Sequence, residues 1–370
     1  MLADWELVDL YRRLRDRDVL SVYLNADEHD PAEKTAWRRR LNSLAARARG
    51  ATDAASGGRS AFDASLARVL ERLDQYTGFL PGRGWVAFAT PDRLWYAEPL
   101  AAPMPDMVAW GEGMHVAPLV RGLKQNRPVV VLLLDRQRAR LFRYRAGVLS
   151  EPQDMVPDTP EPDVAGVHGG KRATTHTGMR GATCTDVLRC LEDMAAERLA
   201  RLAVDRAVAC AGEDGFLVLG GTPEMIAAAA RRLPKTMTGR VVELPSLHLA
   251  MTPAELKPML EGAASALSRK QQEDLLREVL DAARAGGLGA VGREGVEHAL
   301  REGGVETLLI SRRLRESDPE LVERCIRAAL DAGVTRVEEL AGEGADLLDG
   351  EGNGIAARLR FRPARTVGAA

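Results

Sequence analysis

Apolar and polar residues alternate along the first part of the chain in patterns typical of strands and helices. Residues 19–24 (Val-Leu-Ser-Val-Tyr-Leu) have the β-branched and aromatic composition of a buried strand. Two later stretches repeat apolar residues every three or four positions, as amphipathic helices do. The pattern therefore predicts, in order, a strand at 19–24, a helix at 31–49, a loop at 51–60, a helix at 62–76, and a hairpin of strands at 85–89 and 94–97.

The middle of the chain begins with a connector and continues with the same alternation of elements. Prolines and glycines within residues 100–127 predict the connector. The elements predicted after it are a buried strand at 128–135, an arginine-rich strand to 145, a helix from Thr183 or Thr185 to about 204, a strand at 215–219, and a helix capped by Thr222 with Pro223 first. We expect the long helix to turn these side chains inward: Leu188, Leu191, Ala195, Leu199 and Leu202.

The last third also alternates helices and strands. Helices are predicted at 267–285, 293–302 and 319–332, and strands at 305–310, 334–338 and 355–362. The fold class predicted is α/β, in three α/β domains over residues 1–112, 113–250 and 251–370. Prolines at 245 and 253 and a shift to net negative charge support the boundary near 250.

Composition excludes several classes of protein. The chain has 370 residues, of which 45% are apolar and 28% charged. This apolar fraction is too high for a disordered chain. Its longest apolar runs are about six residues, against the ~20 that a membrane-spanning helix needs. The acidic N-terminus is unlike a signal peptide, and four cysteines fit no disulfide framework. We therefore expect a cytoplasmic protein.

The net charge of −2 argues against a general nucleic-acid coat, but arginines gather locally. Five of them lie within ten residues beside Phe142 and Tyr144, and strand alternation would put the first three on one face. Phosphate contact and a solvent-exposed hairpin explain this pattern equally well. The helix at 31–49 carries a further group, for which a solvated face is the favoured alternative. The arginines considered for RNA contact are Arg136, Arg138, Arg140, Arg143, Arg145, Arg38, Arg39 and Arg40.

A long stretch of low apolar content separates the arginine-rich strand from the long helix. Residues 151–163 hold five acids and no base, whereas residues 164–185 hold three bases and no acid. Loops of this length are usually functional or disordered. Gly169-Gly170 beside Lys171 and Arg172 is suited to a backbone-amide nest for a phosphate; a flexible surface turn is the alternative.

Sequence motifs of enzymes are mostly absent. Gly287–Gly292 matches G-x-G-x-x-G but follows a predicted helix, where a dinucleotide site requires a strand. There is no Walker A sequence and no G-x-S-x-G elbow. His168, His176, Cys184 and Cys190 have spacings unlike those of common zinc sites. We therefore assign no catalytic residue, no metal site and no cofactor.

Taken in order, the three segments resemble the archaeal and eukaryotic class-1 release factors and their relative Pelota. The residues that carry the likeness are the Pro-Gly turn into a strand at 76–88, His115–Leu119, the hairpin at 129–147, the His-Gly-Gly loop before the long helix, and the Gly-rich turn with its Arg-x-Arg strand at 350–361. The resemblance is to the bacterial branch, which includes Balon-like ribosome hibernation factors. It implies three domains like the N, middle and C domains of that family.

Two departures from the family pattern bear on function. The loop at 51–60 lacks the Asn-Ile-Lys-Ser sequence that reads stop codons, and Gly169-Gly170 is followed by Lys171 where release needs glutamine. The glutamine side-chain amide both donates and accepts hydrogen bonds, whereas the lysine ammonium group can only donate them. The resemblance then implies a factor that occupies the ribosomal A site of idle ribosomes without releasing peptide. The peptidyl-transferase-centre loop would comprise His168, Gly169, Gly170, Lys171, Arg172, His176 and Arg180.

Two other functions stay open. A peptidyl-tRNA hydrolase that rescues stalled ribosomes would use a non-standard catalytic loop, and an RNA-binding regulator would act away from the ribosome. The partners implied are ribosomal RNA and elongation factor Tu or another translational GTPase. We expect no membrane partner, and a monomer off the ribosome.

Overall fold

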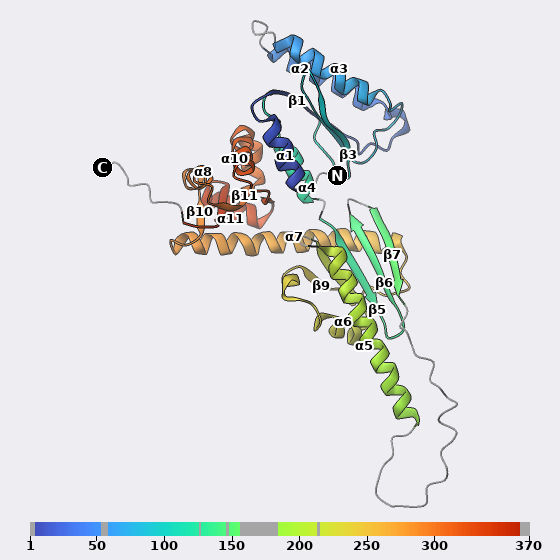
Figure 1. Ribbon diagram of the computed structural model, residues 1–370. Helices are drawn as coiled ribbons and strands as arrows, with labels where there is room; N and C mark the ends of the chain where they lie inside the picture. The colour runs from blue at the N-terminus through green and yellow to red at the C-terminus, as the bar shows by residue number, and fades with distance from the viewer. Residues whose placement is uncertain are drawn as a thin grey trace, which may run out of the picture. The chain divides into compact units, whose positions relative to one another are not determined.

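The computed structural model describes residues 4–52, 58–125, 127–145, 148–155, 184–212 and 215–362. Within these ranges three sheets are flanked by helices, which confirms the predicted α/β class (Figure 1). The chain divides into two compact units: unit 1 comprises residues 1–126 and 269–370, and unit 2 comprises residues 127–268. No helix in the described part of the chain is long and apolar enough to cross a membrane.

The first sheet of unit 1 is antiparallel, with strand order β3-β2-β1-β4. Its strands are β1 (Asp18–Asn25), β2 (Gly84–Ala89), β3 (Leu94–Leu100) and β4 (Met107–Glu112). A 3-10 turn (Pro31–Glu33) precedes α2 (Ala36–Ala51), and α2 and α3 (Gly58–Leu73) cover one face. Trp37, Leu41 and Phe62 from these helices pack against Leu20 and Trp85 of the sheet.

The prediction of a plain connector over residues 100–127 is wrong. β4 lies there and pairs with β1, with Val108 opposite Val22, and α4 (Ala117–Gln125) follows it. Local proline and glycine content predicted a loop, whereas pairing with a strand distant in sequence completes the sheet.

The second sheet of unit 1 has the order β10-β13-β11-β12, with β11 and β12 parallel. Its strands are β10 (Gly289–Val291), β11 (Val305–Ser311), β12 (Val337–Leu340) and β13 (Ile355–Leu359). The helices around it are α8 (Arg293–Arg301), α9 (Arg312–Ser317), α10 (Pro319–Asp331), α11 (Glu343–Gly352) and the C-terminal part of α7 (Pro253–Arg284).

Residues from both ends of the chain form one core in unit 1. Leu10 and Leu14 of α1 (Asp4–Leu14) belong to the same buried cluster as Val322 and Ile326 of α10. The buried Glu323 carboxylate accepts hydrogen bonds from the backbone N–H groups of Val116 and Ala117, at 2.7 and 2.9 Å. These bonds satisfy donors at the start of α4. Each predicted domain range contains one sheet, while the first and third ranges share a core.

Unit 2 is built on a mixed sheet of order β7-β6-β5-β8-β9, in which β5, β8 and β9 run parallel. Its strands are β5 (Val129–Leu134), β6 (Ala139–Arg145), β7 (Val148–Met155), β8 (Phe216–Gly221) and β9 (Val241–Glu243). α5 (Cys184–Ala211) and α6 (Pro223–Ala230) pack on one face, and the N-terminal part of α7 packs on the other. The start of α5 extends past the end of the sheet (Figure 1).

The predicted inner face of α5 is wrong in part. Leu191 and Leu202 are 37% and 49% exposed, whereas Ala196, Ala200 and Ala203 are buried against the sheet. Small side chains let the helix backbone approach the strands closely, so the alanine face packs inward and these two leucines remain outside. The side chain of Leu188 lies outside the described residues.

Other boundaries also differ from the sequence predictions. α7 begins at Pro253 rather than at 267, and β12 spans Val337–Leu340 rather than 334–338. α1, α9 and α11 were not predicted. Thr222 occupies the N-cap position of α6 with Pro223 after it, as predicted, but its hydroxyl makes no capping hydrogen bond.

Candidate functional site

The Gly-Gly loop predicted to enter the peptidyl-transferase centre lies outside the described residues. This applies to each of its predicted members: His168, Gly169, Gly170, Lys171, Arg172, His176 and Arg180. The structure does describe the elements on either side of the loop, β7 before it and α5 after it. Both belong to unit 2 and lie against β6, where the predicted arginine cluster is found.

The first two arginines of that cluster lie in a turn rather than in a strand. The Asp135 carboxylate accepts hydrogen bonds from the backbone N–H groups of Gln137 and Arg138, both at 2.7 Å, and so closes the turn between β5 and β6. β6 begins only at Ala139. The prediction that Arg136, Arg138 and Arg140 share one strand face is therefore wrong.

Arg136 and Arg140 are held by carboxylates of unit 2. Arg136 forms ion pairs with Asp193 of α5 and, at 3.5 Å, with Glu224 of α6. Arg140 pairs with both carboxylate oxygens of Glu151, at 2.7 and 2.9 Å, and donates to the backbone oxygen of Met251 at 3.1 Å. Its side chain is only 14% exposed and its guanidinium lies over the Phe142 ring. These contacts stabilise the fold of unit 2.

Arg143 provides the more open part of the cluster, and the half-buried Arg145 follows it on the same strand. They lie on the face of β6 opposite Arg140, toward the end of the strand. Arg143 is exposed, and no described carboxylate forms an ion pair with it. Burial, followed by the like charge of Arg143, lowers the pKa of Arg145. Two neighbouring cations of this kind favour an anion beside them.

The three arginines of α2 differ in how much they are held by the fold. Arg38 lies over the Trp37 ring and donates to the backbone oxygen of Tyr76 at 2.8 Å. Arg40 pairs with Asp106 at 3.0 Å and donates to the backbone oxygen of Asn25 at 2.9 Å. Arg39 is 75% exposed and pairs only at the surface, with Glu33. Of the three, Arg39 is the most accessible to a partner.

Sequence reasoning missed a group of flat cationic and aromatic side chains on the first sheet. The guanidinium groups of Arg17 and Arg93 lie 5.3 and 4.7 Å from the centre of the Trp95 ring. The Trp95 indole N–H donates to the Thr90 hydroxyl at 2.8 Å, which fixes the ring. In the sequence only the spacing of Arg93, just before β3, and Trp95, within it, signals the pair, since Arg17 lies far away, just before β1. Such groups are surfaces on which unpaired bases stack.

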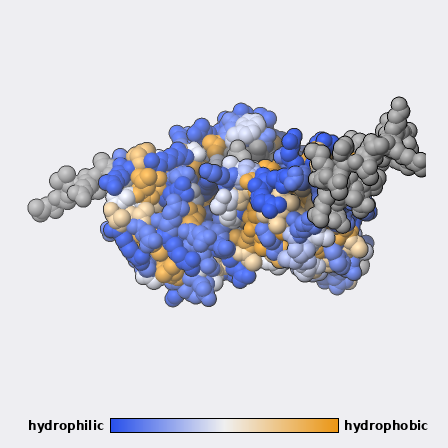
Figure 2. Space-filling model, turned by 90° about the horizontal axis from the view of Figure 1, so that it is seen from below, coloured by the Kyte–Doolittle hydropathy of each residue, from blue (hydrophilic) through white to orange (hydrophobic). Residues whose placement is uncertain are grey.

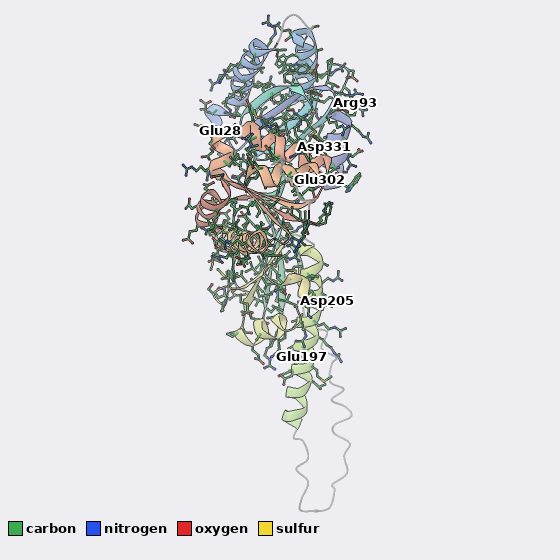
Figure 3. The ribbon with its side chains drawn as sticks, turned by 90° about the vertical axis from the view of Figure 1, so that its left-hand side faces the viewer. Glu28, Arg93, Glu197, Asp205, Glu302 and Asp331 are labelled. Carbon is green, nitrogen blue, oxygen red and sulfur yellow. The ribbon has the colours of Figure 1, made fainter. Side chains whose placement is uncertain are left out.

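A cavity of about 650 Å³ lies between α8 and α10 of unit 1. Glu302 and Asp331 lie at this cavity and come from these two helix ends (Figure 3). Its lining also includes Leu300, Arg301, Arg324 and Cys325, so apolar and charged groups meet there. Burial raises the pKa of the Cys325 thiol to about 11, so this sulfur stays protonated at neutral pH and is not a nucleophile.

The described residues offer no other obvious chemistry. No group of three or more His, Cys, Asp or Glu side chains in the described part of the chain is placed to hold a metal ion. Seen from below, the surface is mostly hydrophilic with smaller apolar areas between (Figure 2).

Comparisons with known proteins agree with the resemblance found in the sequence. Residues 115–267 match the family model described as bacterial archaeo-eukaryotic release factor family 10. A search of the curated proteins finds no match. Among solved structures, the archaeal translation termination factor aRF1 is 16% identical, with 97% of this chain and 99% of that chain covered and a TM-score of 0.26.

Two Pelota structures give similar values. Archaeoglobus fulgidus Pelota is 16% identical over 78% of this chain and 75% of that one, with a TM-score of 0.35. A model of ribosome-bound archaeal Pelota and ABCE1 is 15% identical, with 98% of this chain and 95% of that chain covered and a TM-score of 0.41. These TM-scores are too low to add to the argument. The match to bacterial archaeo-eukaryotic release factor family 10 covers α4 of unit 1 and nearly all of unit 2, so it is over residues 115–267 that this chain is similar to that family.

Proposed function

We propose that this protein is a ribosome-binding translation factor that occupies the A site of idle ribosomes without releasing peptide. The observation that carries the proposal is the family match over residues 115–267, which includes the Gly-Gly loop and the elements on either side of it. A factor of this kind acts in the cytoplasm, with ribosomal RNA as its main contact. Elongation factor Tu or another translational GTPase is the proposed delivery partner.

The sequence of the loop supports binding without hydrolysis. Lys171 stands where release factors have glutamine, and residues 164–185 contain no glutamine. An ammonium group donates hydrogen bonds but accepts none, so it cannot orient a water molecule by donating and accepting at once. Lys171, Arg172 and Arg180 still provide positive charge for an RNA-lined cavity.

The arginines of β6 supply a second proposed RNA contact. Because Arg136 and Arg140 are engaged with carboxylates of unit 2, the proposal places the contact at the exposed Arg143. Guanidinium groups bind phosphate oxygens in a fork geometry. On α2, Arg39 is the corresponding candidate.

Peptide release on programmed ribosomes tests the function directly. Purified protein should bind vacant ribosomes but release no peptide from P-site peptidyl-tRNA, because correct positioning of a reacting group supplies several kcal/mol of barrier lowering. Lys171→Ala should lower occupancy modestly and leave the absent hydrolysis unchanged. Robust release that is lost in His168→Ala or Lys171→Ala would instead identify a peptidyl-tRNA hydrolase.

Co-sedimentation with 70S ribosomes tests the proposed contact surface. Binding should weaken steeply as salt rises, because each neutralised phosphate releases counterions. Arg143→Glu should weaken binding severalfold and make it less sensitive to salt. Arg293→Glu, an equal charge change at an exposed position of unit 1, is the control and should bind like the wild type. Absent or salt-insensitive binding would favour a regulator that acts away from the ribosome.

A further inference from the structure

Three arginines from two separate elements of unit 1 lie around the end of β12. β12 runs parallel to β11, and the register sets Glu339 opposite Ile310, one residue before the Ser311 cap of α9. α9 therefore begins beside Glu339 and carries Arg312 and Arg315. α4 packs against β12 and carries Arg121. None of these three arginines was singled out from the sequence.

The carboxylates in this cluster are already engaged by the α9 arginines. Arg315 lies 3.2 Å from Glu339 and 3.1 Å from Glu316. Arg312 lies 3.0 Å from Glu316, one helical turn further along α9. Two guanidinium groups thus engage both carboxylates, and no described residue forms an ion pair or hydrogen bond with the half-buried Arg121.

The electrostatic environment of Arg121 is unfavourable for a cation. Burial lowers the pKa of Arg121, Glu339 raises it, and the like charges of Arg315 and Arg312 lower it further. A half-buried guanidinium that lacks a partner loses water without gaining a hydrogen bond. An anion at this position would supply the missing charge and acceptors.

We propose that Arg121, Arg312 and Arg315 form a binding site for a phosphate group. A phosphate offers several acceptor oxygens, and guanidinium groups arriving from two directions can each donate two parallel hydrogen bonds to it. The site lies in unit 1, outside the residues matched to the family model, apart from Arg121 itself. It does not depend on the proposed ribosomal function.

Thermal unfolding of the full chain with added inorganic phosphate tests the site. Ionic strength is held constant with chloride so that general screening does not contribute. Phosphate bound to the folded state should raise the unfolding midpoint of the wild type in a saturable way. Arg121→Gln should weaken the apparent phosphate affinity at least about tenfold, since charge-assisted hydrogen bonds are the strong ones.

Two exposed arginines provide a matched pair of variants. Arg312 and Arg293 are 63% and 52% exposed, and each pairs with a glutamate four residues later, at 3.0 and 3.1 Å. Arg312→Gln removes a proposed ligand and should also weaken phosphate affinity, severalfold. Arg293→Gln makes the same change of charge elsewhere and should respond like the wild type. Equal losses in both variants would show a general charge effect and overturn the site.

A second readout separates a binding residue from a structural one. Without phosphate, Arg121→Gln should unfold at the same temperature as the wild type or higher, because it removes a cation that its neighbours repel. A lower midpoint combined with an unchanged phosphate response would show that Arg121 serves the fold, and the proposal would be wrong. Should Arg121→Gln fail to fold, Arg312→Gln decides the question by its phosphate response alone.

The source of the phosphate is then distinguished by competition. A short single-stranded RNA and ATP are each titrated against bound inorganic phosphate in the wild type and in Arg312→Gln. Displacement by RNA alone assigns the site to a polynucleotide backbone, and displacement by ATP assigns it to a small phosphorylated ligand. Competition that persists undiminished in Arg312→Gln would place both ligands elsewhere and contradict the assignment.

Discussion

Individual side chains in this protein show how strongly the environment decides what a charged residue does. Arg140 and Arg143 lie three residues apart in one strand, yet the first is held by Glu151 and the second is exposed. Arg83 and Asp27 give a clearer case of a matched pair, with two hydrogen bonds at 3.0 and 2.7 Å. Hydrogen bonding by Arg83 is the main cause that lowers the pKa of Asp27. This pair therefore links stability to pH.

Asp27→Asn should lower the free energy of unfolding at neutral pH by about 0.5–1 kcal/mol, a value reduced for the partial exposure of Arg83. Because the folded-state pKa of Asp27 lies below its unfolded value, the contribution is present above about pH 4 and is lost as the pH falls further. The gap between wild type and variant, measured by urea unfolding, should close in that acid range. Asp205→Asn, at an exposed position of α5, should leave stability unchanged at every pH (Figure 3).

At the scale of elements, α5 shows that side-chain size, as well as apolar character, sets the buried face of a helix. Its inner face consists largely of alanines, with Leu199 among them, that pack on β5 and β6, whereas Leu191 and Leu202 lie outside. Close packing leaves little room for added atoms beside the sheet.

Ala200→Leu should therefore destabilise unit 2 by about 1–3 kcal/mol, because overpacking forces side chains and backbone to shift. Leu202→Ala removes a larger group but from an exposed site, so its effect should stay within about 0.5 kcal/mol. Chemical unfolding of the two variants measures both values. A larger loss of stability in Leu202→Ala than in Ala200→Leu would instead support the inner face of α5 that the sequence pattern predicts.

For the whole molecule, the shared core of unit 1 is the main organising feature. Leu10 and Tyr11 near the start of the chain lie in one cluster with Val322 and Ile326 near its end. Tyr11 also donates a hydrogen bond to Asp331 at 3.2 Å. Segments that share a core in this way are expected to unfold together, whatever their separation in sequence.

Ile326→Ala should lower stability by about 2–5 kcal/mol, through lost burial and the cavity left behind. Hydrogen exchange should show reduced amide protection in α1 and α4 as well as in α10, while β5 and β8 of unit 2 keep theirs. Leu219→Ala, in the core of unit 2, should give the opposite distribution. A loss of protection confined to residues 269–370 would instead support three separately folding domains, as the sequence predicts.

The sequence by itself determined the features that depend on neighbouring residues. Apolar periodicity identified β1, β2, β5 and β8, the helix at 319–332 and the α/β class, because local burial patterns and turn residues specify them. The ordered likeness of its segments identified the release-factor resemblance that the family model supports over residues 115–267.

Only the tertiary structure decided the features that depend on contacts between distant residues. Pairing with β1 made residues 107–112 a strand, close approach to the sheet chose the alanine face of α5, and Glu151 removed Arg140 from the accessible arginines. Arg121 became a candidate phosphate ligand only because the fold places it near the charged groups of α9 and β12. Such contacts are set by packing and charge between segments far apart in sequence, which no local pattern contains.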